Sequence, residues 1–479
     1  MKDKPLVSVV IPTYNRKEIN LTSKIKNRRE FIIVLCISLL IALIICRKVV
    51  FSSGYIFLAE EFEVYTLSNF IKVYYPTWDD LFQIFNWPSF LKIYLYTFFT
   101  IISSIFSSYK LLQILLILSP YAIAFSGMYY LLKHLLLSMN KSYKMDSNFL
   151  VLLVSAFIYT INPWLASHPR SILLRFHYAL LPLLTLFFFR MIKEKDYKYS
   201  VLFALTLSFM EATRHFLLLI PFFLIIYVFL FISGEFTKKT LKSSSLAIFL
   251  FTLFSLGKYL PVLLATIKNP SFFSVMGGIV RSSQSVTSML HVLNLRAYSP
   301  GTAAEIWNAP YDAFYCNLFI PITALCFSYL LFKKKRRDES KLLYKYSFPV
   351  IFSFYTFFSF VKLPNFFLND AFGQLILRLF RSSSQTSMYV CLPLSVMLGY
   401  SLVKIYCLKK DQRKATIISL FLVIIILSSI SSWSMLTGDM NGYWTPSQVP
   451  EDYKKVNDYL SQNNDSHVLW VPSFFGARA

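Results

Sequence analysis

The sequence predicts an all-α polytopic membrane protein with about 11 transmembrane helices, outer-side loops and a short α/β carboxyl-terminal tail. Two numbers favour this class: 56% of the 479 residues are hydrophobic and only 15% are charged. Soluble globular domains carry roughly 25% charged residues, so much of this surface is expected to face lipid rather than water. The third observation is a series of long apolar runs that short basic segments separate.

Eleven apolar runs approach the roughly 17 to 25 residues that a helix needs to cross a bilayer. They cover residues 31–46, 111–132, 149–166, 176–192, 199–214, 216–233, 244–266, 313–332, 346–361, 386–407 and 415–436. A twelfth run, 93–107, is short and rich in serine, and Lys110 follows it closely. We expect this run to form an interfacial or re-entrant helix on the outer side rather than a span.

Basic residues predict the orientation of the chain. If 93–107 does not cross, one side of the membrane receives the loops 1–30, 133–148, 190–198, 234–243, 333–345 and 408–414. These loops hold 29 of the 48 Lys and Arg residues, and such residues concentrate on the cytosolic side. The amino terminus is therefore expected in the cytosol and the carboxyl terminus outside the cell membrane. The first span is expected to act as an uncleaved signal anchor.

The outer side receives the longer loops in this arrangement. They are 47–110, 167–175, 267–312, 362–385 and the tail from 437. Loops that a rigid scaffold holds in place commonly carry function, so we expect the functional residues on this side.

Charge and cysteine content argue against two other classes. The net charge is +24, but the basic residues lie in short runs between apolar stretches, whereas a nucleic-acid binder gathers them on one soluble face. Nucleic acid is therefore not an expected partner. The six cysteines lie in or beside apolar runs without a CxxC or a His-Cys cluster, so neither a disulfide nor a zinc site is predicted.

The two ends of the chain differ from the membrane domain, which is expected to cover 31–436. Residues 1–30 form a basic leader in which Pro5–Arg16 alternates like a buried strand that enters a turn, and this segment resembles the opening strand of family 2 glycosyltransferases. The span that starts near residue 31 leaves no room for the nucleotide-binding domain of that family. Residues 437–479 are expected to begin an extracytoplasmic domain that ends early, with a helix over 451–460, a turn and a strand over 468–471.

Acidic residues gather in the first outer loop. Glu60, Glu61 and Glu63 follow the first span, although the whole chain holds only 24 Asp and Glu residues. Carboxylates at a membrane surface suit a general base, or a site for a metal and sugar hydroxyls. The alternative is a solvated loop whose charges keep it out of the lipid.

The loop after the third predicted span combines a helix stop with aromatic and basic residues. Asn162 and Pro163 are expected to end the helix, and Trp164 is expected in the interfacial aromatic belt. His168, Arg170 and Arg175 follow, on a side of the membrane where the orientation bias disfavours basic residues. Arginine binds phosphate through bidentate, charge-assisted hydrogen bonds. These three residues are therefore candidates for substrate binding.

Further candidates for substrate binding are expected toward the same side. They are Arg214, His215, Lys258, Arg378 and Arg381. Ionisable groups at membrane depth are usually functional or paired with one another. The alternatives are that Arg214 and Glu211 neutralise each other at helical spacing, and that the last two arginines reach out to the interface.

The layout of residues 31–479 resembles the multi-spanning GT-C glycosyltransferases, most closely the arabinofuranosyltransferase and YfhO-like groups of archaeal and bacterial membrane proteins. The resemblance rests on the acidic first outer loop and on the short motifs NPW, YALLPL, KYLP, LFRSSS and VPEDY. The chain departs from that family at Ala59-Glu60-Glu61, where a Gly-Asp pair is common, and at Phe380-Arg381-Ser382-Ser383, where Phe-Arg-Glu-Pro is expected.

The resemblance implies an inverting sugar transfer in which Glu60 or Glu61 takes the proton of the acceptor hydroxyl. The donor would be a polyprenyl-phosphate-linked sugar and the acceptor a glycan or glycoprotein, with no nucleotide at the outer face; whether a divalent metal takes part stays open. By position in the family, the phosphate contacts would come from Arg170, Arg175, Arg378 or Arg381.

Three other functions stay open. The chain could be a transporter of lipid-linked glycans or polysaccharides, although no internal repeat is evident and the outer loops are long for a carrier. It could be a non-catalytic membrane subunit of an envelope-assembly complex. A family 2 enzyme is the third alternative, but the acidic motifs of that family are missing.

Overall fold

The structure is a computed structural model, and every secondary-structure element among its described residues is a helix. The described residues are 14–54, 109–139, 145–168, 172–194, 196–210, 217–268, 342–360, 383–407 and 413–440, with single residues between and after these ranges. The helices are α1 (Tyr14–Val50), α4 (Tyr109–Met139), α5 (Met145–Thr160), α6 (Pro163–Ala166), α7 (Ile172–Glu194), α8 (Tyr197–Met210), α9 (Leu219–Ile232), α10 (Lys238–Lys268), α15 (Leu342–Phe360), α17 (Ser383–Cys407), α18 (Arg413–Ser431) and α19 (Trp433–Leu436).

Ten of the eleven predicted apolar runs overlap these helices, and the eleventh, 313–332, lies outside the described residues. Five helical stretches are long and apolar enough to cross a membrane: Arg28–Val50, Gln113–Met139, Phe149–Ala166, Leu174–Glu194 and Thr386–Val403. Two further apolar stretches, in α9 and α18, are shorter. The described part of the chain is therefore all-helical and has the helices of a membrane protein.

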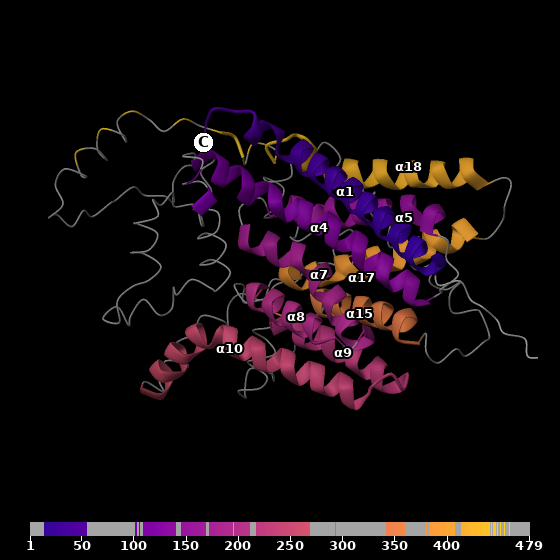
Figure 1. The fold of residues 1–479 in the computed structure, drawn as a ribbon. Coiled ribbons are helices and arrows are strands. Elements are labelled where there is room, and N and C mark those ends of the chain that lie inside the picture. Colours follow the sequence, from indigo (N-terminus) through magenta and orange to yellow (C-terminus); the bar gives the residue numbers. More distant parts are fainter. Residues whose placement is uncertain are drawn as a thin grey trace, which may run out of the picture.

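The helices pack side by side into one bundle, with α18 and α1 along one edge and α10 along the opposite edge (Figure 1). The centre of the bundle is apolar. α17 has the most buried apolar stretch, because every residue of Thr386–Val403 is buried. α7 lies between α4 and α8 and contacts both.

Neighbouring helices run in opposite directions in the first pair. At one end of the bundle, Glu30 of α1 accepts a hydrogen bond from Lys133 of α4 at 2.7 Å. At the other end, Lys110 near the start of α4 donates to Ser52, which follows α1, at 3.2 Å. α4 therefore begins where α1 ends, which is the relative direction expected if 93–107 does not cross.

We name the two ends of the bundle after residues that lie there. The Arg175 end holds the end of α1 and the starts of α4 and α7, since Arg175 lies close to Cys46 and Tyr121. The Lys193 end holds the ends of α4 and α7, where Lys193 Nζ donates to Ser138 Oγ at 2.6 Å.

Hydroxyl side chains inside the helices satisfy their hydrogen bonds locally. Many Ser and Thr hydroxyls donate to the carbonyl oxygen four residues earlier, as Thr185 does to Leu181 at 2.8 Å and Ser208 to Ala204 at 2.8 Å. A polar group that faces lipid or a dry core needs such a partner, because no water is present to replace it.

The described residues at the two ends of the chain are helical. Of the predicted amino-terminal strand and turn, Pro5–Arg16, only the last three residues are described, and they already belong to α1. At the other end, Glu451, Lys455 and Tyr459 are helical and exposed, as expected for the predicted helix over 451–460. The predicted turn and strand that follow lie outside the described residues.

Candidate functional site

Two of the eleven predicted site residues, His168 and Arg175, have described side chains, and the structure brings them into contact. Lys258 lies within α10, but its side chain is not described. The remaining candidates lie outside the described residues: Glu60, Glu61, Glu63, Arg170, Arg214, His215, Arg378 and Arg381.

Asn162 and Pro163 end the third predicted span as expected. α5 stops at Thr160, and the short helix α6 starts at Pro163 with Asn162 as its N-cap. The Asn162 side-chain oxygen accepts from the Leu165 N–H at 3.1 Å, and its amide group donates to Tyr178 at 2.8 Å. This cap redirects the chain across the end of the bundle toward the neighbouring helix α7.

Trp164 is fully buried, so its predicted place in the interfacial aromatic belt is wrong. Its ring stacks on Tyr178 of α7 and on His168, with centroids 4.9 and 4.2 Å apart. The reason is the turn at Asn162, after which α6 packs against α17 and α19 with all of its residues buried.

His168 is buried at the end of this turn. Its Nδ1 lies 2.8 Å from the carbonyl oxygen of Trp164, and since a carbonyl can only accept, Nδ1 carries the hydrogen in this contact. Burial lowers the pKa of His168 to about 4; the bond to Trp164 acts the other way, and the nearby Arg175 adds to the lowering. The imidazole is therefore neutral at neutral pH.

Arg175 lies in the first turn of α7, inside the loop range 167–175 that the sequence predicts, and it is fully buried. Its Nε donates to the carbonyl oxygen of His168 at 2.7 Å. Its guanidinium carbon lies 4.5 Å from the centre of the Trp444 ring. A buried charge is costly unless other groups compensate it, and here a carbonyl and an aromatic face do so in part.

Tyr121 of α4 completes the group that surrounds the guanidinium. It is fully buried, and its ring meets Trp444 edge to face with centroids 6.3 Å apart. We call Tyr121, Trp164, His168, Arg175 and Trp444 the Arg175 cluster. It joins α4, α6, α7 and the segment after α19 at one end of the bundle.

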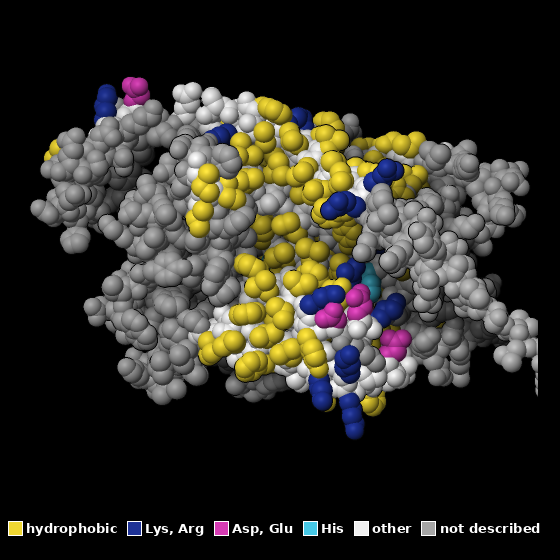
Figure 2. Space-filling model, viewed as in Figure 1, with side chains coloured by type: hydrophobic (Ala, Val, Ile, Leu, Met, Phe, Trp, Pro, Cys, Tyr) yellow, Lys and Arg dark blue, Asp and Glu magenta, His cyan; other side chains and the backbone are white. Residues whose placement is uncertain are grey.

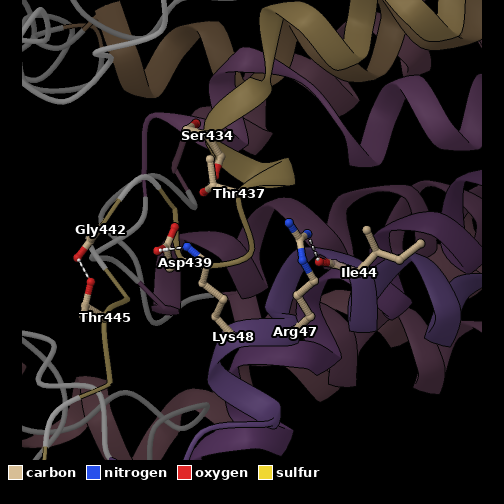
Figure 3. Close-up of polar contacts among 8 residues, drawn as sticks. All are labelled: Ile44, Arg47, Lys48, Ser434, Thr437, Asp439, Gly442 and Thr445. Carbon is tan, nitrogen blue, oxygen red and sulfur yellow. Dashed lines mark hydrogen bonds and ion pairs between the residues drawn. The ribbon is translucent and has the colours of Figure 1, made fainter.

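Residues 437–445, the carboxyl-terminal turn, carry Trp444 into the cluster. The Trp444 N–H donates to the carbonyl oxygen of Asp439 at 2.7 Å, which closes the turn. The turn lies beside the end of α1 (Figure 3), where Lys48 Nζ donates to Asp439 Oδ2 at 2.6 Å and the Lys48 N–H to Gly438 at 3.2 Å. Gly438 has a φ of +88°, a conformation that costs other residues energy.

The ion pair between Lys48 and Asp439 is intact at neutral pH. Burial acts to raise the pKa of Asp439, but the hydrogen bonds from Lys48 and neighbouring donors outweigh it, so the pKa lies below its usual value. The contribution of this carboxylate to stability is present above the usual carboxyl pKa and is lost as the pH falls through the lowered one.

A second buried polar group lies next to the cluster on α7. His177 Nδ1 lies 3.0 Å from the carbonyl oxygen of Met210, and its Nε2 lies 2.7 Å from the hydroxyl of Tyr389. The carbonyl can only accept, so Nδ1 carries the hydrogen and Nε2 accepts from the tyrosine. This contact connects α7, α8 and α17.

Tyr355 of α15 extends this second group. Its ring stacks on Tyr389 with centroids 5.0 Å apart, and its hydroxyl donates to the carbonyl oxygen of Leu218. Met210 and Leu218 flank the segment 211–216, which holds the predicted residues Arg214 and His215. Side chains of α7 and α15 therefore hold the backbone on both sides of that segment.

The sequence did not single out Trp444, Tyr121 or Tyr389 as parts of a polar site. Each is an aromatic residue in or beside an apolar run, where packing is the ordinary role. The signal that does exist is indirect: Gly438 and Gly442, in a tail of few glycines, mark a tight turn that would fix the residue after them. Within the described residues, no three His, Cys, Asp or Glu side chains gather closely enough to hold a metal ion.

Compared with known proteins, the chain matches no family model and no curated sequence.

Proposed function

We propose that the protein is a membrane glycosyltransferase that moves a sugar from a polyprenyl-phosphate donor to an acceptor on the extracytoplasmic face, with eleven spans. The observation that supports the proposal is the meeting of three candidate segments at the Arg175 end. The chain leaves α1 there at Val50, ten residues before Glu60; the basic loop enters α7 there; and the carboxyl-terminal turn covers Arg175 there.

The chemistry proposed for this end needs a base and a cation. Glu60 or Glu61 takes the proton of the acceptor hydroxyl while that oxygen attacks the anomeric carbon, and the lipid phosphate leaves with the bonding electrons. Guanidinium groups stabilise the charge of the leaving phosphate. Position in the resembled family assigns this contact to Arg170, Arg175, Arg378 or Arg381.

Arg175 and His168 take a different part in the proposal. Arg175 is wrapped by a carbonyl oxygen and a tryptophan ring, and neutral His168 supplies that carbonyl. In this state the pair holds the basic loop in place, so we treat both as positioning residues. A phosphate can replace these contacts only if the carboxyl-terminal turn moves away.

The test measures sugar transfer in membranes that carry the full chain, with a labelled polyprenyl-phosphate sugar pool. Glu60→Gln and Glu61→Gln are compared with the wild type and with Glu194→Gln. Glu194 is a half-exposed partner of Arg190 at the Lys193 end, so the control makes the same chemical change far from the proposed site. Expression and membrane insertion of each variant are checked.

Loss of transfer by at least about a hundredfold in one acidic variant, with the control unchanged, is expected for a general base. Equal transfer by all variants would show that the base is wrong. A wild type that transfers nothing from any donor in a broad panel would favour the transporter or the non-catalytic subunit instead.

A further inference from the structure

α10 has an inverted distribution of side chains. The residues that it buries are small or carry hydroxyls: Thr240, Ser243, Ser244, Ala247 and Ser255. Among the described side chains, five large apolar residues are exposed, Leu241, Ile248, Phe249, Leu253 and Leu256, together with Ser245 and Thr252. A helix on the surface of a soluble protein shows the opposite pattern, so the exposed face of α10 is built for an apolar surrounding.

The buried face of α10 is already occupied by neighbouring helices. α10 packs closely along α8, and small residues allow this approach, as in helix pairs within membranes. Tyr227 of α9 donates to Ser244 Oγ at 2.5 Å. The apolar face therefore points away from the bundle, with Phe249 64% exposed and Leu253 50% exposed.

Lysines stand at the start of the same exposed face. Lys238, Lys239 and Lys242 are exposed in the first two turns of α10. Lys198 of α8 forms an ion pair with Asp196 at 2.8 Å. The charge of Lys239 helps to lower the pKa of the same carboxylate, so Lys198 and Lys239 lie near each other.

Positive charge remains in excess over the acids at this place. Lys193 and Glu235 face each other here, and the remaining acid, Glu194, lies 3.7 Å from Arg190. The main partners of these acids, Lys198, Lys193 and Arg190, do not belong to α10, and only Asp196 also interacts with a lysine of α10, Lys239. A ligand that lies along α10 would meet lysines first and an apolar stripe next. Figure 2 shows the same order on one face of the molecule, a broad hydrophobic band beside a group of charged side chains.

We propose that α10 binds an anionic phospholipid, whose headgroup phosphate lies among Lys238, Lys239 and Lys242 and whose acyl chain lies along Ile248, Phe249 and Leu253. The dimensions fit. From Lys242 to Leu253 a helix rises about 16 Å, which is about half of the roughly 30 Å hydrocarbon core of a bilayer. The stripe thus accompanies one acyl chain through one leaflet.

Charge complementarity favours this ligand over a neutral lipid or a protein partner. A lysine near an anionic membrane surface adds about 1 kcal/mol, equivalent to about a fivefold preference. A second copy of this chain would bring the same lysines into contact with one another, which is unfavourable. This inference does not depend on sugar transfer, so an inactive transferase would leave it unchanged.

The experiment uses photocross-linking of the full chain in vesicles of phosphatidylcholine with a minor share of phosphatidylglycerol. A photoreactive benzoyl-phenylalanine replaces Phe249 in one variant and Phe223 in a control. Phe223 is the same residue type but lies buried in α9, in contact with Phe188. Mass spectrometry identifies the adducts.

The label at position 249 is expected to give phospholipid adducts, with phosphatidylglycerol at least about fivefold above its share of the bilayer. The buried control is expected to give adducts within the protein. The triple change Lys238→Gln, Lys239→Gln and Lys242→Gln is expected to abolish the enrichment. The matched triple change Lys333→Gln, Lys334→Gln and Lys335→Gln, in the most basic predicted loop, is expected to preserve it.

Three outcomes would overturn the proposal. Adducts between two copies of the chain, or between position 249 and another segment of the same chain, would show that protein covers this face. Phospholipid adducts in proportion to the bulk composition would show a lipid contact without a headgroup site. Equal loss of enrichment in both triple variants would show that total charge, and not the lysines of α10, attracts the lipid.

Discussion

Replacing Trp444 with alanine is expected to release the carboxyl-terminal turn from the bundle. The Trp444 ring is fully buried against Tyr121, and the Arg175 guanidinium lies over its face at 4.5 Å. Truncating a buried aromatic residue to alanine costs about 3 to 5 kcal/mol, and a desolvated cation–π contact is worth about 2 kcal/mol. These contributions overlap, so we expect a loss of about 4 kcal/mol in the free energy of opening the turn.

Hydrogen exchange of two backbone amides measures this opening directly. The Trp444 N–H donates to Asp439 within the turn, and the Lys48 N–H donates to Gly438 across to α1. Because each 1.4 kcal/mol changes an equilibrium tenfold, a loss of about 4 kcal/mol accelerates exchange at both amides by up to about a thousandfold. Amides in the middle of α17 are expected to keep their protection, since the opening is local.

Trp433→Ala is the matched control for this prediction. Trp433 begins α19, shortly before the turn, and is 48% exposed. Its truncation is expected to change exchange at the two amides less than about fivefold, as for surface substitutions in general. Equal exchange in the two variants, or no acceleration in Trp444→Ala, would refute the view that the Arg175 cluster holds the turn in place.

Three further predictions concern backbone strain, pH and an ion pair, and unfolding of the detergent-solubilised protein measures all three. Gly438→Ala is expected to lower the free energy of unfolding by about 2 kcal/mol or more, because the φ of Gly438 is +88° and the added methyl would lie 2.8 Å from Cγ of Arg47. Gly234→Ala, with a φ of +70° and no atom within 4 Å of the added methyl, is expected to cost about 1 kcal/mol. Equal costs would contradict the steric argument. Acidification from about pH 7 to about pH 5 is expected to destabilise the wild type by about 2 kcal/mol more than it destabilises the His168→Gln variant. The reason is that the pKa of His168 is about 4 in the folded state and 6.5 in the unfolded state, so proton uptake favours the unfolded state. Parallel pH profiles of the two proteins would show that His168 does not contribute. Glu30→Gln is expected to cost about 1 to 3 kcal/mol, because it removes a nearly buried ion pair, while Glu194→Gln, a half-exposed partner, is expected to cost less than about 1 kcal/mol.

The positions of the helices could be predicted from the sequence because hydropathy reports directly which stretches avoid water. The ends of the helices could not. α10 begins at Lys238 and not at 244, and α1 extends back to Tyr14, well before 31. Hydropathy marks only the apolar part of a helix, whereas backbone hydrogen bonding continues into polar residues at either end.

Of the predicted basic loop 167–175, the last four residues, 172–175, belong to α7, and the role of Arg175 was not evident from the sequence. The orientation bias marks Arg175 as unusual on the side where the sequence predicts it, but it does not predict what lies over the guanidinium. That information depends on Trp444, which is distant in sequence, and on the turn that positions it. Trp164 shows the same limit, because an aromatic residue at a helix end suits both the interfacial belt and a buried stack.

The burial of Arg175 separates two ways in which it can serve a phosphate site. If a lipid phosphate binds this guanidinium directly, the phosphate must displace the Trp444 ring, because no part of Arg175 is exposed while the ring covers it. Binding and opening are then linked, and a polyprenyl phosphate must accelerate exchange of the Trp444 amide. If Arg175 instead positions the loop that carries Arg170, the same ligand leaves the turn closed and the exchange rate unchanged. Amide exchange with and without polyprenyl phosphate therefore distinguishes a binding role from a positioning role for the same arginine.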